Sequence, residues 1–247
     1  MINPKQKLSN KIFQKDIELK LMRDGFGEGL VTAGEKDERV VVLTADLKES
    51  TRVNLFAEHF PKRFIEVGVA EQALATIASG MANYGKIPFI SSYAIFSPGR
   101  NWEQVRTNIS IDAYPVKIIG AQSGLNIGHY GVTHQGIEDL SLTTALPNMT
   151  VVVPADYEEA KKATIEIAKT PGPVYLRLPR SESPAFTTEN SPFKVGRAEV
   201  LWESKAPEVA IIACGLPVYE ALLAAKALDK KGMQTLVINS HTVKPLD

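Results

Sequence analysis

The 247-residue sequence has little of what several protein classes require. Its one cysteine, Cys214, cannot form an internal disulfide, so a reducing compartment is the simpler expectation. The 28 basic and 28 acidic side chains balance, which argues against the clustered positive charge that binds nucleic acids or anionic membranes. No apolar run approaches the roughly 18 residues of a membrane span, and none follows the charged start as in a secretory signal. These absences predict a soluble, cytoplasmic protein.

Short apolar runs alternate with amphipathic segments along the first 180 residues. Strands are expected at 39–43, 64–67, 87–91, 116–120, 150–153 and 174–178, and helices at 16–36, 52–59, 71–84, 100–113, 138–146 and 156–169. Strands that alternate with helices form βαβ units, in which helices cover both faces of a mostly parallel sheet. The pattern predicts a doubly wound α/β domain.

A change of composition divides the chain. Residues 180–192 combine Pro, Ser, Thr and Glu without periodic apolar positions, which is typical of a linker. Beyond this linker the sequence predicts strands at 198–202, 209–214 and 234–239 and a helix at 217–231. So few elements bury little core. We expect an N-terminal lead at 1–15, a complete α/β domain at 16–179, and an incomplete second α/β domain at 193–247 whose end looks cut short.

Open parallel sheets bind ligands at the carboxyl ends of their strands. Polar or aromatic residues follow predicted strands at Asp46, Glu71, 92–100, 122–135 and Arg180. Glu71 opens a helix and follows Gly, Val and Ala residues, so we expect a poorly solvated carboxyl suited to sharing a proton. A helix-start acid stabilised by the macrodipole is the simpler alternative.

Two further patterns mark the same predicted edge. Tyr93 and Phe96 lie three residues apart, so both can face one side, either as ordinary packing or as a platform for a flat heterocycle. The stretch GLNIGHYGVTHQG contains His129 and His134, which can move protons near neutral pH. No cysteine lies nearby and the spacing matches no common ligand motif, so we expect no metal site in this chain.

Three sequence blocks occur in one order: GVAEQALATIASGMANYGKIPFISSYAIF, EQVRTNISIDAYPVKIIGAQSGLNIGHYGVTHQGIEDLSLTTALPNMTVVVPAD and GPVYLRLPR. Together they resemble the pyrimidine-binding domain of transketolase, a thiamine-diphosphate enzyme. The segment after them resembles the start of the transketolase C-terminal domain. The resemblance implies the thiamine-diphosphate-binding α/β fold and the transfer of a two-carbon ketol unit between sugar phosphates.

The resemblance also implies cofactor contacts. In the family, a glutamate at the position of Glu71 hydrogen-bonds the ring nitrogen of the cofactor's aminopyrimidine, where a shared proton activates the cofactor. Tyr93 and Phe96 would flank the pyrimidine ring. Asp46, in the sequence TADL, matches the family's aspartate near the cofactor.

Substrate contacts follow from the same resemblance. Arg180, in LRLPR, matches a substrate-phosphate arginine, and Arg23 and Ser50 fall where the family places further phosphate contacts. Guanidinium groups suit phosphate because they donate two parallel charge-assisted hydrogen bonds. His134 matches a histidine that contacts the sugar hydroxyls, and with Glu71 it is the expected catalytic pair.

Two departures from the family qualify these expectations. Tyr130 stands where transketolases usually have an acidic residue that recognises a sugar hydroxyl, which puts the usual sugar preference in doubt. No GDG followed by Asn is present, although the family uses this motif to hold Mg²⁺ and the diphosphate. We therefore expect the C-terminal subunit of a split transketolase, active with an N-terminal subunit that binds Mg²⁺ and the diphosphate, in an oligomer with two copies of this chain.

Other functions remain open at this point. The corresponding region of 1-deoxy-D-xylulose-5-phosphate synthase is similar, and the beta subunit of a 2-oxoacid dehydrogenase is a more distant relative. A non-catalytic assembly module that kept only the fold is a third alternative. Intact Glu71 and His134 argue against it, whereas Tyr130 favours it.

Overall fold

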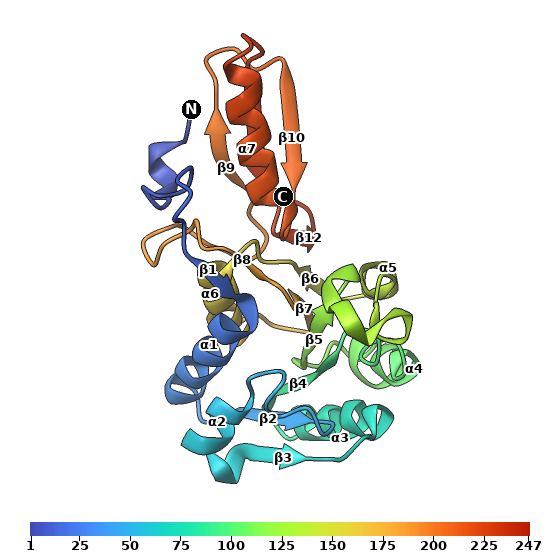
Figure 1. Cartoon of the computed structure of the whole chain (residues 1–247). Helices are drawn as coiled ribbons and strands as arrows, with labels where there is room; N and C mark the ends of the chain where they lie inside the picture. The colour runs from blue at the N-terminus through green and yellow to red at the C-terminus, as the bar shows by residue number, and fades with distance from the viewer.

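The computed structural model describes residues 1–247, and its main element is a seven-stranded sheet (Figure 1). The strand order is β12-β6-β7-β5-β4-β2-β3. The strands are β2 (Val40–Thr44), β3 (Phe64–Glu66), β4 (Ile87–Tyr93), β5 (Lys117–Ser123), β6 (Thr150–Val152), β7 (Val174–Pro179) and β12 (Thr242–Lys244). All neighbours pair in parallel except β12, which runs antiparallel to β6. The predicted doubly wound, mostly parallel sheet is confirmed.

Helices cover both faces of the sheet, as Figure 1 shows. One layer contains α1 (Met22–Lys36), α2 (Asn54–His59) and α6 (Tyr157–Ile167), and the other contains α3 (Glu71–Asn83), α4 (Trp102–Gln104) and α5 (Asp139–Thr144). The period of two along each strand assigns neighbouring side chains to opposite faces. Val42 accordingly packs in the first layer's core and Leu43 in the second.

Glycines let α1 and α6 approach closely. A Cβ atom at Gly25 would lie 2.2 Å from the Tyr157 carbonyl oxygen, and one at Gly29 would lie 2.6 Å from the Lys161 carbonyl oxygen. Any larger residue at these two positions would separate the helices. This packing fixes the start of α1, and therefore Arg23, against the sheet.

A smaller unit lies at one end of the large sheet (Figure 1). Its sheet has the order β10-β11-β9, formed by β9 (Glu199–Glu203), β10 (Val209–Ala213) and β11 (Thr235–Asn239), with α7 (Pro217–Asp229) packed on it. The N-terminal segment joins this unit, because Ile12 and Phe13 pack with Trp202 and Val218.

Several predicted boundaries are wrong. The helix expected from residue 16 begins at Met22, because β1 (Leu19–Leu21) pairs antiparallel with β8 (Glu182–Pro184), a strand inside the predicted linker. The helix expected at 100–113 is a short α-helix that continues as a π-helix at Val105–Ser110. Strand β12 was not predicted, and it returns the chain to the large sheet. The four segment boundaries stay predictions.

Two buried carboxylates join the units. Asp156 caps α6 by accepting from the Glu159 N–H at 3.0 Å, and its other oxygen accepts from both backbone N–H groups of residues 186–187 at 2.9 and 2.6 Å. Glu159 accepts from Asn239 Nδ2, on β11, at 2.6 Å. Burial raises the pKa of both carboxyls, that of Glu159 to about 7, with the charge of Asp156 adding to the effect.

None of the helices is both long and apolar enough to cross a bilayer.

Candidate active site

Glu71 is a buried acid with one arginine partner. It is the first residue of α3, where the helix dipole favours a negative charge, and its side chain is 2% exposed. Arg100 Nη1 donates to Glu71 Oε2 at 3.0 Å. Asn101 Nδ2 donates to the Glu71 backbone carbonyl at 3.0 Å, which fixes the start of the helix. The carboxylate is therefore desolvated and held in place.

An aromatic pair lies beside this carboxylate, in the turn that follows β4. The rings of Tyr93 and Phe96 are nearly parallel, with centroids 5.9 Å apart and an interplanar angle of 19°. The guanidinium carbon of Arg100 lies 5.1 Å from the Phe96 centroid. Arg100 thus contacts both Glu71 and Phe96.

The glycine-rich loop after β5 brings His134 to the aromatic pair. The His134 ring meets Phe96 edge-on, with centroids 5.4 Å apart at 74°, and Tyr130 stacks on His134 at 5.1 Å. Gly136 permits this approach, because a Cβ atom there would lie 2.9 Å from the backbone nitrogen of Ile95. A residue without a side chain is therefore needed at position 136, and the absence of a side chain there lets the loop pack against the segment that carries Phe96.

Arg180 extends the same group of side chains from the end of β7. Its guanidinium carbon lies 4.6 Å from the Tyr130 ring centroid, and its Nη1 donates to the Ile127 carbonyl at 3.2 Å. These contacts position a cation against Tyr130 without neutralising it, because no carboxylate pairs with Arg180.

Arg23 lies near this cation at the start of α1. Its Nη1 donates to the Ser50 carbonyl at 3.3 Å, and its buried Nε has no partner. Burial lowers the pKa of Arg23. The positive charges of Arg52 and, more weakly, Arg180 lower it further. The sequence did not reveal Arg52, which pairs with Asp24.

The structure brings most of the predicted residues together through direct contacts. The contacts run in the order Glu71, Arg100, Phe96, His134, Tyr130 and Arg180. Arg100 was not among the predicted site residues, although it lies in the segment 92–100, which was selected because it follows a predicted strand. It treated Tyr130 as a departure from the family and not as a contact between two site residues.

Three predicted residues, Asp46, Ser50 and Arg23, lie outside this order of contacts, whereas Tyr93 joins it by stacking on Phe96. Asp46 follows β2 with φ of 60°, and its backbone N–H donates to Glu66 Oε1 at 2.8 Å. Its own carboxylate is exposed and accepts no hydrogen bond. The Ser50 hydroxyl donates to the Leu47 carbonyl at 3.2 Å, so the carbonyl of Ser50, and not its hydroxyl, meets Arg23.

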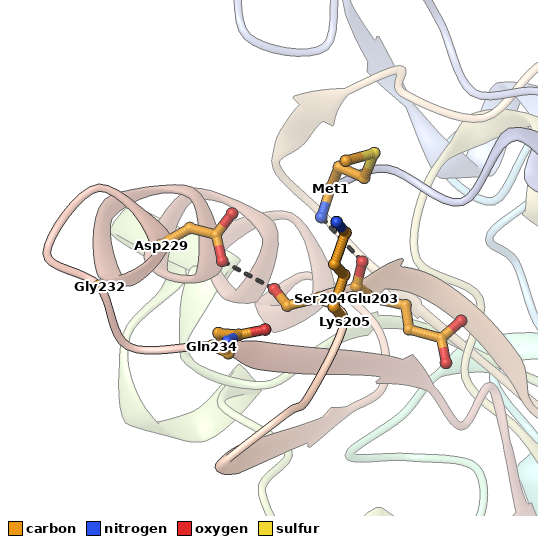
Figure 2. Close-up of a pocket in the computed structure, with 7 residues that line it drawn as sticks. All are labelled: Met1, Glu203, Ser204, Lys205, Asp229, Gly232 and Gln234. Carbon is orange, nitrogen blue, oxygen red and sulfur yellow. Dashed lines mark hydrogen bonds between the residues drawn. The ribbon is translucent and has the colours of Figure 1, made fainter.

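A cavity of about 610 Å³ on the smaller unit contains none of these residues (Figure 2). It is lined mainly by polar residues, among them Ser204, whose Oγ donates to Asp229 Oδ1 at 2.7 Å. The N-terminal ammonium of Met1 donates to the Glu203 carbonyl at 2.9 Å on the same surface. These bonds connect surface loops and bring no reactive groups together.

Comparisons with known proteins agree with the geometry. The family model of the transketolase pyrimidine-binding domain matches residues 20–185, and that of the transketolase C-terminal domain matches residues 196–247. A protein from Methanocaldococcus jannaschii that carries the name transketolase C-terminal section is 40% identical over 228 residues, which are 92% of this chain and 72% of the relative.

Two further relatives have related names. A 6-deoxy-6-sulfo-D-fructose transketolase subunit from Clostridium sp. is 38% identical over 238 residues, which are 96% of this chain and 73% of the relative. A solved structure described as a split gene transketolase, inactive beta4 tetramer, superposes with a TM-score of 0.84 at 40% identity, and covers 92% of this chain and 73% of that one. With family models matching most of its length and relatives of this identity, the chain belongs to the transketolase family.

Proposed function

We propose that this chain is the C-terminal subunit of a thiamine-diphosphate-dependent transketolase, which transfers a two-carbon ketol unit between sugar phosphates. The observation that carries the proposal is the buried Glu71 carboxylate beside the stacked Tyr93 and Phe96 rings. Such a site suits a flat heterocycle that carries ring nitrogens. The names of two relatives, one a C-terminal section and the other a subunit, support the division into two chains.

The residues around Glu71 fit the pyrimidine half of thiamine diphosphate. A planar cationic group already lies against both the carboxylate and the Phe96 ring, namely the guanidinium of Arg100, so the space accepts a flat hydrogen-bond donor. With the cofactor bound, Glu71 would accept a hydrogen bond from the ring nitrogen and hold a proton there, and Tyr93 and Phe96 would contact the ring. The bound cofactor supplies the electron sink for carbon–carbon bond cleavage. Asp46 lies at the same edge of the sheet, and we keep it as a cofactor-side residue.

We assign the substrate to the arginines and His134. Arg180 and Arg23 present charged donors to a phosphate, with Ser50 beside Arg23, because guanidinium groups bind phosphate oxygens through charge-assisted hydrogen bonds. His134 offers a ring nitrogen to a sugar hydroxyl, and its Nδ1 lies 2.9 Å from the hydroxyl of Thr133. That contact holds Nδ1 and leaves Nε2 available for a sugar hydroxyl.

A second chain is proposed to complete the site. The sequence has no GDG followed by Asn, so we assign Mg²⁺ and diphosphate binding to an N-terminal subunit. Apolar side chains next to the site support a covering protein surface: Val69 is 68% exposed, Val132 80% and Ile137 62%. We further propose two copies of this chain in the assembly and a cytoplasmic location, the latter supported by composition alone.

Reconstitution tests the proposal. The purified chain alone is expected to show no ketol transfer from a ketose phosphate to an aldose phosphate, and addition of the N-terminal subunit with Mg²⁺ and thiamine diphosphate is expected to restore it. Robust turnover by the chain alone would contradict the shared site. Consumption of pyruvate with release of carbon dioxide by the pair would instead favour a deoxyxylulose-phosphate-synthase-like or oxoacid-dehydrogenase-like activity.

A further inference from the structure

The Arg100 side chain makes the two contacts that we propose for the pyrimidine ring of the cofactor. Its Nη1 donates to Glu71 Oε2 at 3.0 Å, and its guanidinium carbon lies 5.1 Å from the centroid of the Phe96 ring. A guanidinium is flat, delocalised and rich in N–H donors, and it stacks on aromatic faces. It therefore offers the carboxylate and the ring the same chemistry as a protonated aminopyrimidine.

We infer that Arg100 is a surrogate for the pyrimidine: in the cofactor-free chain it occupies the place of the ring, and it must release Glu71 before the cofactor binds. The inference rests on the proposed function and adds a competitor to the same site. It makes Arg100 a positioning residue that keeps Glu71 in place between assembly and cofactor loading.

Burial explains why Glu71 needs such a partner. Its side chain is 2% exposed, and Arg100 is the one group that donates a hydrogen bond to its carboxylate. Asn101 donates to the Glu71 backbone and leaves the carboxylate unaffected. An ionised carboxylate at this depth without a partner is strongly destabilising.

Arg100 and Glu71 differ in their exposure to water, which allows the cofactor to replace Arg100 as the partner of Glu71. The Arg100 side chain is 53% exposed and makes no other hydrogen bond, so water replaces Glu71 as its partner when it moves away. Glu71 has no such substitute except an incoming donor. An N–H group of the cofactor ring can therefore displace Arg100 without leaving a buried charge unpaired.

Removing the Arg100 side chain then has two effects of opposite sign. The free chain loses the only partner of a buried carboxylate, so its thermal unfolding midpoint falls. The cofactor no longer competes with the guanidinium, so it binds more tightly. An arginine that only stabilised the fold would not produce the second effect, and an arginine that bound the cofactor directly would weaken binding when removed.

The experiment compares wild type, Arg100→Met and Arg106→Met, the last being an exposed arginine on the next turn that makes no ion pair. Unfolding midpoints are measured on the chain alone, and dissociation constants for thiamine diphosphate with Mg²⁺ are measured on the reconstituted pair by fluorescence quenching. We expect Arg100→Met to lower the midpoint by a few degrees and to tighten cofactor binding roughly tenfold, the scale of one charged hydrogen bond. Arg106→Met should change neither quantity.

Two further variants keep the test decisive. In a Glu71→Gln background, Arg100→Met should give no further gain in affinity, because the competition is for the carboxylate. Arg100→Lys keeps the positive charge but not the flat guanidinium, and it serves as the second variant where Arg100→Met folds poorly. Its affinity for thiamine diphosphate should lie between those of wild type and Arg100→Met. Unchanged or weaker binding by the arginine variants, with wild type binding normally, overturns the inference alone. Absence of binding by the wild-type pair overturns the proposed function, and the inference with it.

Discussion

The guanidinium of Arg180 lies over the ring of Tyr130, 4.6 Å from its centroid, and His134 stacks on the same tyrosine with ring centroids 5.1 Å apart. Tyr130 therefore connects the arginine proposed to bind phosphate with the histidine proposed to contact the sugar. At the position where the resemblance implied an acid, this chain has an aromatic ring that contacts both Arg180 and His134. The departure from the family has a structural role.

Truncation of this ring should weaken substrate binding more than turnover. Tyr130→Ala removes the surface on which Arg180 rests, and a cation–π contact contributes about 0.5–2 kcal/mol. We expect KM for the sugar phosphate to rise roughly two- to thirty-fold in the reconstituted pair, while Tyr130→Phe stays near wild type. Tyr84→Ala, at a side chain that is 89% exposed, is the matched control. A KM for Tyr130→Ala equal to that of the control would remove the ring from the site.

Arg180 itself should discriminate phosphorylated from unphosphorylated sugars. Arg180→Gln deletes a charged donor, and hydrogen bonds to charged groups contribute about 1.5–3 kcal/mol. KM for a sugar phosphate is expected to rise roughly ten- to hundred-fold, whereas turnover of a large excess of an unphosphorylated ketose should change little. Equal losses on both substrates would mean that Arg180 supports the loop at 124–136 and not the phosphate.

The parts of the fold that could be predicted from the sequence are those specified by a local residue pattern. Each strand from β2 to β7 contains short apolar stretches, such as VVVL in β2 and II in β5, so the order of these strands along the chain could be predicted. The strands β1 (LKL), β8 (ESP) and β12 (TVK) contain no apolar run and pair with partners far away in the sequence, so no local pattern predicts them.

The candidate site shows the same division. Positions shortly after a strand, such as Glu71 after β3 and Arg180 after β7, could be selected because the carboxyl ends of parallel strands form one edge. The contact between Arg100 and Glu71 joins the turn after β4 to the first residue of α3, 29 residues apart in the sequence, and no local pattern specifies it. The family resemblance supplied expected roles, but it did not indicate that Tyr130 would contact both His134 and Arg180.

The hydrogen bonds of the buried carboxyls Asp156 and Glu159, which join the two units, should stabilise the fold less as pH rises. Burial raises the pKa of Glu159 to about 7, above its ordinary value of 4.5, so the folded chain favours the protonated form. The associated stability is complete below about pH 4.5 and is lost as pH rises through 7, by up to about 3 kcal/mol. Urea unfolding between pH 4.5 and 8 should show this loss for wild type and a flatter profile for Glu159→Gln. The neighbouring Glu158→Gln should keep the wild-type slope, and an equal slope in both variants would refute the assignment.

His241 should have the opposite effect on the pH dependence of stability, destabilising the fold as pH falls. It is fully buried against Phe193, with ring centroids 4.2 Å apart, and its Nε2 has no partner. Burial lowers its pKa from 6.5 to about 4, so the stability linked to the neutral ring is complete above about pH 6.5 and is lost as pH falls through 4. His241→Phe should resist unfolding at pH 4.5 better than wild type, with little change at pH 8. His59→Gln, at an exposed histidine, should follow wild type at both pH values.

The central claim is that this chain contributes the acid that activates the cofactor in a site shared with another subunit. Glu71→Ala, with the isosteric Glu71→Gln beside it, tests this most directly in the reconstituted pair, with assembly followed by size-exclusion chromatography. The account predicts that both variants assemble with the partner and lose ketol transfer by at least about a hundred-fold, the scale of a proton-transfer group. Assembly with unchanged ketol transfer would contradict it.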